Sequence, residues 1–270
     1  LFPQAPRRVT MCDTNRLSTG GTNTYTLLVT STNRLCFTLA YSDYPGTEGA
    51  GVKLVNDLDL LVIDSDGVTN YPNGRASPDR LNNVEGVDIA SAVPGLYTMR
   101  VSAYNVPTSP QPYAVVFSGG WDPLAHTPLE NTTNTATPYA IDALVTCLGR
   151  IDTNRCWAFW NTNGSTTVFQ SNRLAAVTGN LYRASIPTQP TNTTIYYFLE
   201  GFVDGKLWRN PASAPTQTYS FMVTPPVRLA VQGNPSNYGA PTPAYGTNWY
   251  AKGRTVSASA PAVVDISASL

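Results

Sequence analysis

The chain has 270 residues, and its 17 Lys and Arg residues balance 17 Asp and Glu residues, so its net charge is zero. Only 13% of the residues are charged, which gives no electrostatic basis for binding nucleic acid or an anionic membrane. The longest apolar stretches fall well short of the ~18 residues of a membrane span, so we expect none. A chain of this length predicts two domains, with room for a partial third.

The first 120 residues consist of short apolar–polar runs separated by turn residues. Residues 25–30 and 35–40 flank the polar run 31–34, a pattern that predicts a β-hairpin. No helical periodicity occurs, so we expect an all-β fold with a β-sandwich over residues 1–120. Further strands of this sandwich are predicted at residues 54–63, 84–89, 96–103 and 113–118, with turns at residues 64–67 and 94–95.

Gly119-Gly120 and the run from Pro123 through Thr137-Pro138 have the composition of a linker or an irregular crossover, and we expect a linker over residues 121–137. Strand patterns then resume, and we expect a second sandwich over residues 138–224 that ends at Thr224-Pro225-Pro226. Residues 225–270 are too few to bury a core of their own, so we expect a partial β-module or tail. The strands of the second sandwich are predicted at residues 140–147, 156–161, 166–169, 181–186, 194–202 and 218–223.

Four cysteines form two pairs that are close in sequence, Cys12 with Cys36 and Cys147 with Cys156. Each pair brackets a predicted strand and its return, so local disulfides are expected, although four cysteines allow three connectivities. The alternative is four buried thiols in a cytosolic protein. A zinc site is disfavoured, because there is one histidine and no short cysteine spacing.

Disulfides would place the chain in an oxidising compartment, and we expect a secreted or extracellular protein. Sequons at Asn131, Asn163 and Asn192 agree with export, although Asn- and Thr-rich chains contain such triplets by chance. The chain opens at Leu1 without a charged and then apolar leader, and we interpret it as part of a longer precursor.

No catalytic motif accompanies this pattern. A serine nucleophile needs a nearby base and carboxylate, but His126 lies in the linker composition and the sequence holds no Gly-x-Ser-x-Gly. We interpret His126 as a structural histidine, either exposed or with its hydrogen bonds satisfied. Phosphate-binding loops and dinucleotide fingerprints do not occur either. We therefore expect that this chain itself is not an enzyme.

Asp57 and Asp59 are the candidate metal ligands. Residues two apart in a strand project to one face, about 7 Å apart, and two carboxylates so placed need a cation or hydrogen-bond donors. Calcium suits such oxygen ligands, with carbonyls of the turn at residues 64–67 as further candidates. The alternative is that Asn82, Asn83 or backbone amides donate to both aspartates and fix the corner at residues 81–85.

Aromatic residues alternate with polar ones in the second predicted sandwich, as at Trp157 and Phe159. An exposed strip including Trp157, Trp160 and Trp208 would favour binding of carbohydrate or peptide. Tryptophan beside a cysteine is more typical of a sandwich core, which we favour.

Several of these segments together resemble a known family. The runs Tyr41-Ser42-Asp43-Tyr44-Pro45-Gly46 and Val55-Asn56-Asp57-Leu58-Asp59-Leu60-Leu61-Val62, with Leu81-Asn82-Asn83-Val84-Glu85, are followed by a strand entered through Pro94-Gly95. Over residues 10–119 this order resembles the jelly-roll-like β-sandwich that follows the catalytic domain of secreted subtilisin-like serine proteases. Residues 181–187 and 195–200 resemble, less specifically, an immunoglobulin- or fibronectin-III-like module.

The resemblance implies a non-catalytic C-terminal region of a secreted subtilisin-like endopeptidase. Its partner would be the upstream catalytic domain, which it would stabilise while aiding substrate access or attachment. The marked Asp, His and Ser motifs of such proteases do not occur in the chain. Sandwiches of this family often bind calcium, which supports the expectation at Asp57 and Asp59. The alternatives are a module that binds carbohydrate or a cell-surface polymer, and a structural array in a surface protein.

Overall fold

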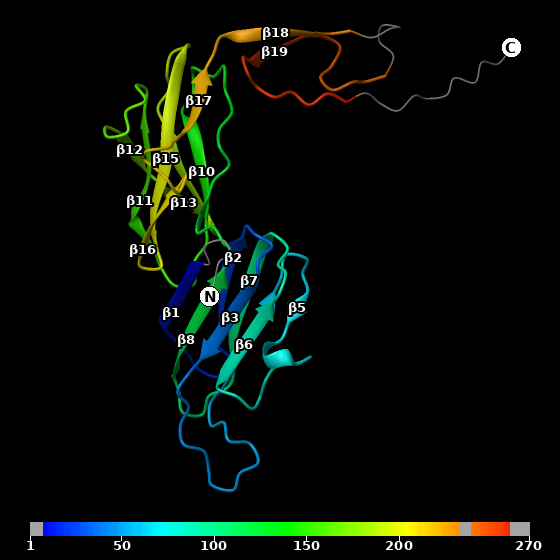
Figure 1. Ribbon diagram of the computed structural model, residues 1–270, viewed down its shortest axis with the longest axis vertical. Coiled ribbons are helices and arrows are strands. Elements are labelled where there is room, and N and C mark those ends of the chain that lie inside the picture. The colour runs from blue at the N-terminus through cyan, green and yellow to red at the C-terminus, as the bar shows by residue number, and fades with distance from the viewer. Residues whose placement is uncertain (1–7, 233–238, 260–270) are drawn as a thin grey trace, which may run out of the picture.

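The computed structural model of the chain describes residues 8–232 and 239–259. It confirms the all-β fold, since nearly every regular element is a strand in an antiparallel sheet. Figure 1 shows two β-sandwiches one after the other along the long axis, with a β-hairpin extending from the far end of the second. None of the helical structure in the described part of the chain is long and apolar enough to cross a bilayer.

The N-terminal sandwich packs two four-stranded sheets face to face around one core. Alternation of side chains along each strand builds this core: Leu35, Phe37 and Leu39 of one sheet and Leu58 and Leu60 of the other are all fully buried. The first sheet has the order β1 (Arg8–Leu17), β8 (Gln111–Gly119), β3 (Leu35–Ala40) and β6 (Val84–Ile89). The second has the order β2 (Thr22–Val29), β7 (Gly95–Asn105), β4 (Asp57–Ile63) and β5 (Thr69–Asn70), and a 3₁₀ turn, η1, covers Pro72–Gly74.

The predicted hairpin of residues 25–40 is wrong, although both of its strands exist. β2 pairs with β7, whereas β3 pairs with β8 and β6, so the connection at residues 31–34 crosses from one sheet to the other. Both strands still turn their apolar residues into one core, because they approach it from opposite sides. Alternation shows which side chains face inward and leaves open which sheet a strand joins.

The second sandwich also has two sheets around its own buried cluster. One has the order β13 (Ala175–Thr178), β14 (Leu181–Ile186), β10 (Tyr139–Val145) and β9 (Leu124–Ala125). The other has the order β12 (Gln170–Arg173), β11 (Ile151–Asn161), β15 (Thr193–Val203) and β16 (Lys206–Asn210), and β17 (Tyr219–Val223) also pairs with β15. The strand predicted at residues 166–169 is wrong, because this segment is a bend held by Ser165 and the strand follows it.

The segment expected to be a linker is largely built into the second sandwich. β9 pairs with β10, Leu124 is fully buried, and Thr132 forms a parallel bridge to Val223. Beyond β17, the strands β18 (Pro226–Val231) and β19 (Gly246–Ala251) form a separate two-stranded hairpin. This hairpin occupies the region expected to be a partial module.

The two sandwiches meet through specific contacts. Val29 forms a β-bridge with Trp121, and Thr26 forms another with Cys147. Strand β2 therefore contacts the second sandwich at two places, just before β9 and just after β10. Trp121 is fully buried, and its ring lies 6.0 Å from that of Trp208. The two units therefore share a packed junction.

Candidate functional site: a buried acidic cluster

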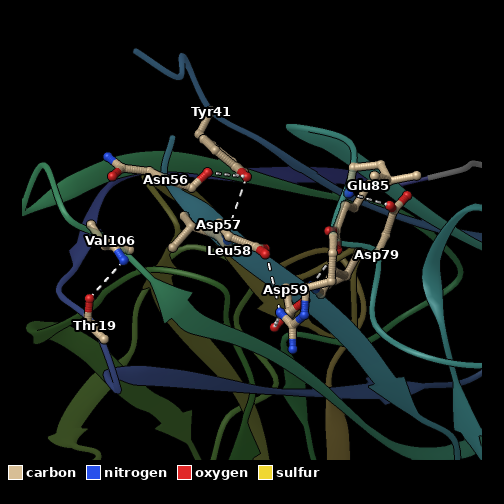
Figure 2. Close-up of polar contacts among 12 residues, drawn as sticks. Thr19, Tyr41, Asn56, Asp57, Leu58, Asp59, Asp79, Glu85 and Val106 are labelled. Atoms are coloured by element: carbon tan, nitrogen blue, oxygen red, sulfur yellow. Dashed lines mark hydrogen bonds and ion pairs between the residues drawn. The ribbon is translucent and has the colours of Figure 1, made fainter. Parts of the chain in front are cut away.

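Strand β4 begins with the two aspartates singled out in the sequence. Asp57 and Asp59 are each 8% exposed, and Figure 2 shows them side by side along the strand. A register shift between Asp57 and Leu58 loosens the pairing with β7 at this point. The strand thus brings two carboxylates under the protein surface at the end of a sheet.

Arg80 supplies the positive charge that these carboxylates need. Its guanidinium hydrogen-bonds to Oδ2 of Asp59 and lies 3.5 Å from Oδ1 of Asp57. The ring of Tyr104 covers the guanidinium from the other side, 3.5 Å from its central carbon. The expected donors Asn82 and Asn83 contact neither aspartate in the described hydrogen bonds: they donate to Asp79 and to the carbonyl of Tyr41. Arg80 is not predicted from the sequence, because its position depends on the fold of the loop before β6.

Asp79 anchors that loop. Its side chain is inaccessible to solvent and accepts hydrogen bonds from Asn73, Asn82 and the backbone amide of Leu81, with Arg75 3.1 Å away. The pKa of Asp79 is lowered: burial alone would raise it, but these donors together outweigh burial. Asp79 is therefore ionised, and its network holds Arg80 over the two aspartates.

Glu85 completes the cluster from strand β6 (Figure 2). It is fully buried, and its Oε2 accepts the amide of Leu60 at 2.6 Å. Burial, more than the neighbouring Asp59 and Asp79, raises the pKa of Glu85 to about 9, so this side chain is neutral at pH 7. Strand alternation could have indicated its burial, because Glu85 and the apolar Val87 are two residues apart and face the same side of β6.

The pKa values of the two aspartates are also raised. Burial and then the charge of Asp59 raise the pKa of Asp57 to about 6, and burial raises that of Asp59. Both shifts are limited by Arg80, which favours the ionised forms. Oδ1 of Asp57, Oδ1 of Asp59 and Oε1 of Glu85 have no hydrogen-bond partner within the described residues.

Calcium has an incomplete ligand set here. The turn at Asp64, expected to contribute carbonyls, lies at the opposite end of β4 from Asp57, roughly 23 Å away at about 3.3 Å per residue. Asp64 instead closes its own turn, accepting the amides of Asp66 and Val68. Within residues 8–232 and 239–259 no three His, Cys, Asp or Glu side chains are grouped to hold a metal ion. Arg80 thus occupies the position that a cation would take.

Side chains of the segment after β3 brace the same corner through hydrogen bonds to the backbone. The hydroxyl of Tyr41 donates to the carbonyl of Asn56 and accepts the amide of Leu58. Both carboxylate oxygens of Asp43 accept backbone amides, those of Val55 and Asn56. Three of the segments that carry the family resemblance, residues 41–46, 55–62 and 81–85, therefore meet near the start of β4.

The four cysteines are all thiols in the structure, and no disulfide is formed among the described residues. The predicted pair Cys12–Cys36 is separated by a whole strand, because Cys12 lies on β1, Cys36 on β3, and β8 runs between them. Two strand spacings amount to about 9.6 Å, beyond the ~7 Å limit between Cα atoms of a disulfide. Cys147 follows β10 and bridges to Thr26, whereas Cys156 lies on β11, where its thiol donates to the carbonyl of Asp152.

His126 is a half-buried residue with a structural role. Its Nδ1 donates to the carbonyl of Asp142 at 2.6 Å, and its Nε2 accepts the hydroxyl of Tyr197 at 2.9 Å. That hydroxyl in turn accepts the amide of Leu129. Burial lowers the pKa of His126, so the ring is neutral at pH 7. With both nitrogens engaged, His126 holds the start of the second sandwich together.

The three tryptophans do not form an exposed row. Trp160 is 3% exposed, and its indole donates to Asn172. Trp208 packs against Trp121 at the junction, and Trp157 is half-buried. Core packing, as favoured from the sequence, therefore describes Trp160.

Part of the chain is similar in sequence to known proteins that are named serine proteases. No protein-family model matches it. It is 39% identical over 99 residues to the serine protease/ABC transporter B family protein tagB of Dictyostelium discoideum, and 32% identical over 117 residues to tagA of the same organism. These alignments cover 33% and 38% of the chain but only 5% and 7% of the relatives. The chain is thus related over about a third of its length to small parts of much longer proteins.

Proposed function

We propose that the chain is the non-catalytic C-terminal region of a secreted subtilisin-like serine protease, whose first sandwich packs on the catalytic domain and stabilises it. The observation that carries the proposal is the partial match to two proteins that are named serine proteases. The matched lengths, 99 and 117 residues, are close to the size of one sandwich. Within this proposal, the parent protein is an endopeptidase and this region carries none of its catalytic residues.

The architecture agrees with a role in stabilising a neighbouring domain. A sandwich with a tightly hydrogen-bonded corner and a packed junction to a second sandwich offers a firm surface to a neighbouring domain. The one histidine in the chain hydrogen-bonds through both ring nitrogens to residues of the second sandwich, which agrees with a structural role for it. These features agree with stabilisation of a partner domain and with attachment or substrate access as secondary roles.

Thermal inactivation of the parent protease tests the proposal. We expect the protease to lose activity on a small peptide substrate at least several-fold faster at elevated temperature when residues 1–270 are removed. Removal of residues 138–270 alone is the matched control and should have a smaller effect, because the proposal assigns stabilisation to the first sandwich. Equal half-lives for the intact and the truncated protease would contradict the proposal.

A further inference from the structure

The junction between the sandwiches brings Cys12 against the segment that begins at Cys147, two cysteines that no sequence pattern pairs. Cys12 lies on β1 of the first sandwich, 6% exposed, with its side chain in the first core. Its sulfur accepts a hydrogen bond from the side-chain amide of Asn15 at 3.3 Å. Cys12 therefore lies on the face of β1 that is turned inward, close to the junction.

Cys147 comes to the same place from the second sandwich. It follows strand β10, and its backbone bridges to Thr26 of the first sandwich. The next residue, Leu148, is fully buried in the first core. A Cβ atom built on Gly149 would lie 3.2 Å from the sulfur of Cys12 and 3.5 Å from its Cβ. The segment that begins at Cys147 thus lies directly against Cys12, and glycine permits the close approach.

One carboxylate holds both segments in place. Asp204, in the turn between β15 and β16, accepts the hydroxyl of Thr10 at 2.9 Å and the amides of Leu148 and Gly149 at 3.0 and 2.8 Å. Thr10 is two residues from Cys12 and faces the same side of β1. Lys206 adds a bond to the carbonyl of Val9. Both cysteine-bearing segments are therefore positioned by the same residue.

We infer that Cys12 and Cys147 are a redox-active pair that forms a disulfide across the junction of the two sandwiches in an oxidising compartment. Glutathione disulfide, or another disulfide oxidant, supplies the chemistry. One cysteine thiolate attacks it, giving a mixed disulfide and one glutathione thiolate, and the second cysteine thiolate displaces the other glutathione. The Cys12–Cys147 bond forms, the oxidant takes up two electrons, and the two protons pass to the released thiolates.

The environment sets the rate of this reaction. Burial, followed by the charge of Asp204 and the nearby Cys12 thiol, raises the pKa of Cys147 to about 12. Because the thiolate is the nucleophile, the folded protein exchanges slowly at neutral pH and faster at alkaline pH. A bond once formed would be protected in the same way. The expected product is a covalent link that keeps the two sandwiches in one orientation.

Peptide mapping of the full chain tests the inference, because trypsin places each cysteine on a different peptide: residues 9–16, 35–53, 101–150 and 156–173. After equilibration in an oxidising glutathione buffer and alkylation in denaturant, we expect a linked pair of peptides 9–16 and 101–150. The chain should then take up two alkyl groups instead of the four taken up after reduction. Linkage of 9–16 to 35–53, linkage of 101–150 to 156–173, or four alkyl groups would overturn the inference.

Two variants provide a second readout that does not depend on mapping. The oxidised wild-type chain should melt at a higher temperature than the reduced chain, and Cys147→Ser should abolish that difference. Cys36→Ser is the matched control and should retain it. Loss of the difference in Cys36→Ser, or its persistence in Cys147→Ser, would contradict the pairing.

Discussion

At the scale of single residues, the first sandwich carries an unusual charge arrangement for a protein with few charges. Asp57, Asp59 and Glu85 are buried together, with Arg80 as the cation that contacts the two aspartates. Glu85 avoids the cost of a buried charge by staying protonated. The cluster therefore combines a neutral acid with a charge network that is paired by the chain itself.

Glu85 should make stability depend on pH. Its pKa is 4.5 when unfolded and about 9 when folded, so the folded state binds more protons between these values. The stabilisation is fully present below pH 4.5 and is lost as the pH rises through about 9, at up to ~1.4 kcal/mol per pH unit. We expect Glu85→Gln to flatten the fall in unfolding free energy between about pH 5 and 9, measured by urea denaturation. The same slope in Glu85→Gln as in wild type would contradict this, and exposed Glu48→Gln is the control.

Arg80 should contribute more to the free energy of unfolding than an ordinary surface cation does. We expect Arg80→Gln to lower the free energy of unfolding by about 2 kcal/mol at pH 7, because two buried carboxylates lose their partner. The exposed pair of Arg183 with Asp142 is the matched control, and Arg183→Gln should change stability by less than ~1 kcal/mol. Equal effects of the two variants would contradict the assignment.

The melting temperature of the chain tests whether calcium binds at Asp57 and Asp59. With Arg80 in the position of a cation, we expect a chelator to leave the melting temperature of the wild-type chain unchanged. A fall on adding the chelator, restored by added calcium, would show that Asp57 and Asp59 hold the ion predicted from the sequence.

At the scale of elements, the turn between β15 and β16 joins the two sandwiches. Asp204 has a backbone φ of 49°, a left-handed conformation that Asp and Asn tolerate better than most residues. In that conformation its carboxylate reaches across to Thr10 and to the amides after Cys147. A two-residue turn thus links β1 of the first sandwich to the segment that follows Cys147.

Asp204→Asn should weaken this link while keeping the turn. The substitution tolerates the same backbone conformation but replaces charge-assisted bonds, so we expect a loss of about 2 kcal/mol. Calorimetry should then show the two sandwiches beginning to melt separately. Asp64→Asn is the control, because Asp64 accepts amides only within its own turn. If Asp204→Asn still melts in a single transition like the wild-type chain, the proposed role of the turn is contradicted.

Much of the strand pattern could be predicted, because alternation of apolar and polar side chains is local. The pairing of β2 and β3 could not, since a four-residue connection fits both a hairpin and a crossing between sheets. The site was half-predicted: Asp57 and Asp59 share a face by strand geometry, whereas Arg80 reaches them only through the folding of a loop anchored by Asp79. The position of Cys12 could not be predicted either, since it lies against Gly149, a residue far away in the sequence.

At the scale of the whole molecule, the chain is a short series of β units. Figure 1 shows the first sandwich at one end and the hairpin β18–β19 at the other, with the second sandwich between them. The described residues include a solid junction between the two sandwiches and a hairpin attached through a few bonds, such as the side-chain amide of Asn131 with the carbonyl of Lys252. Such a series suits a region that supports one neighbour and extends away from it.

The residues encoded ahead of Leu1 test the central proposal most directly. Sequencing the complete transcript should reveal an upstream domain with the Asp, His and Ser motifs of a subtilisin-like protease, ending shortly before this chain. Another β-sandwich or a membrane span in that position would contradict the assignment of this chain to a protease.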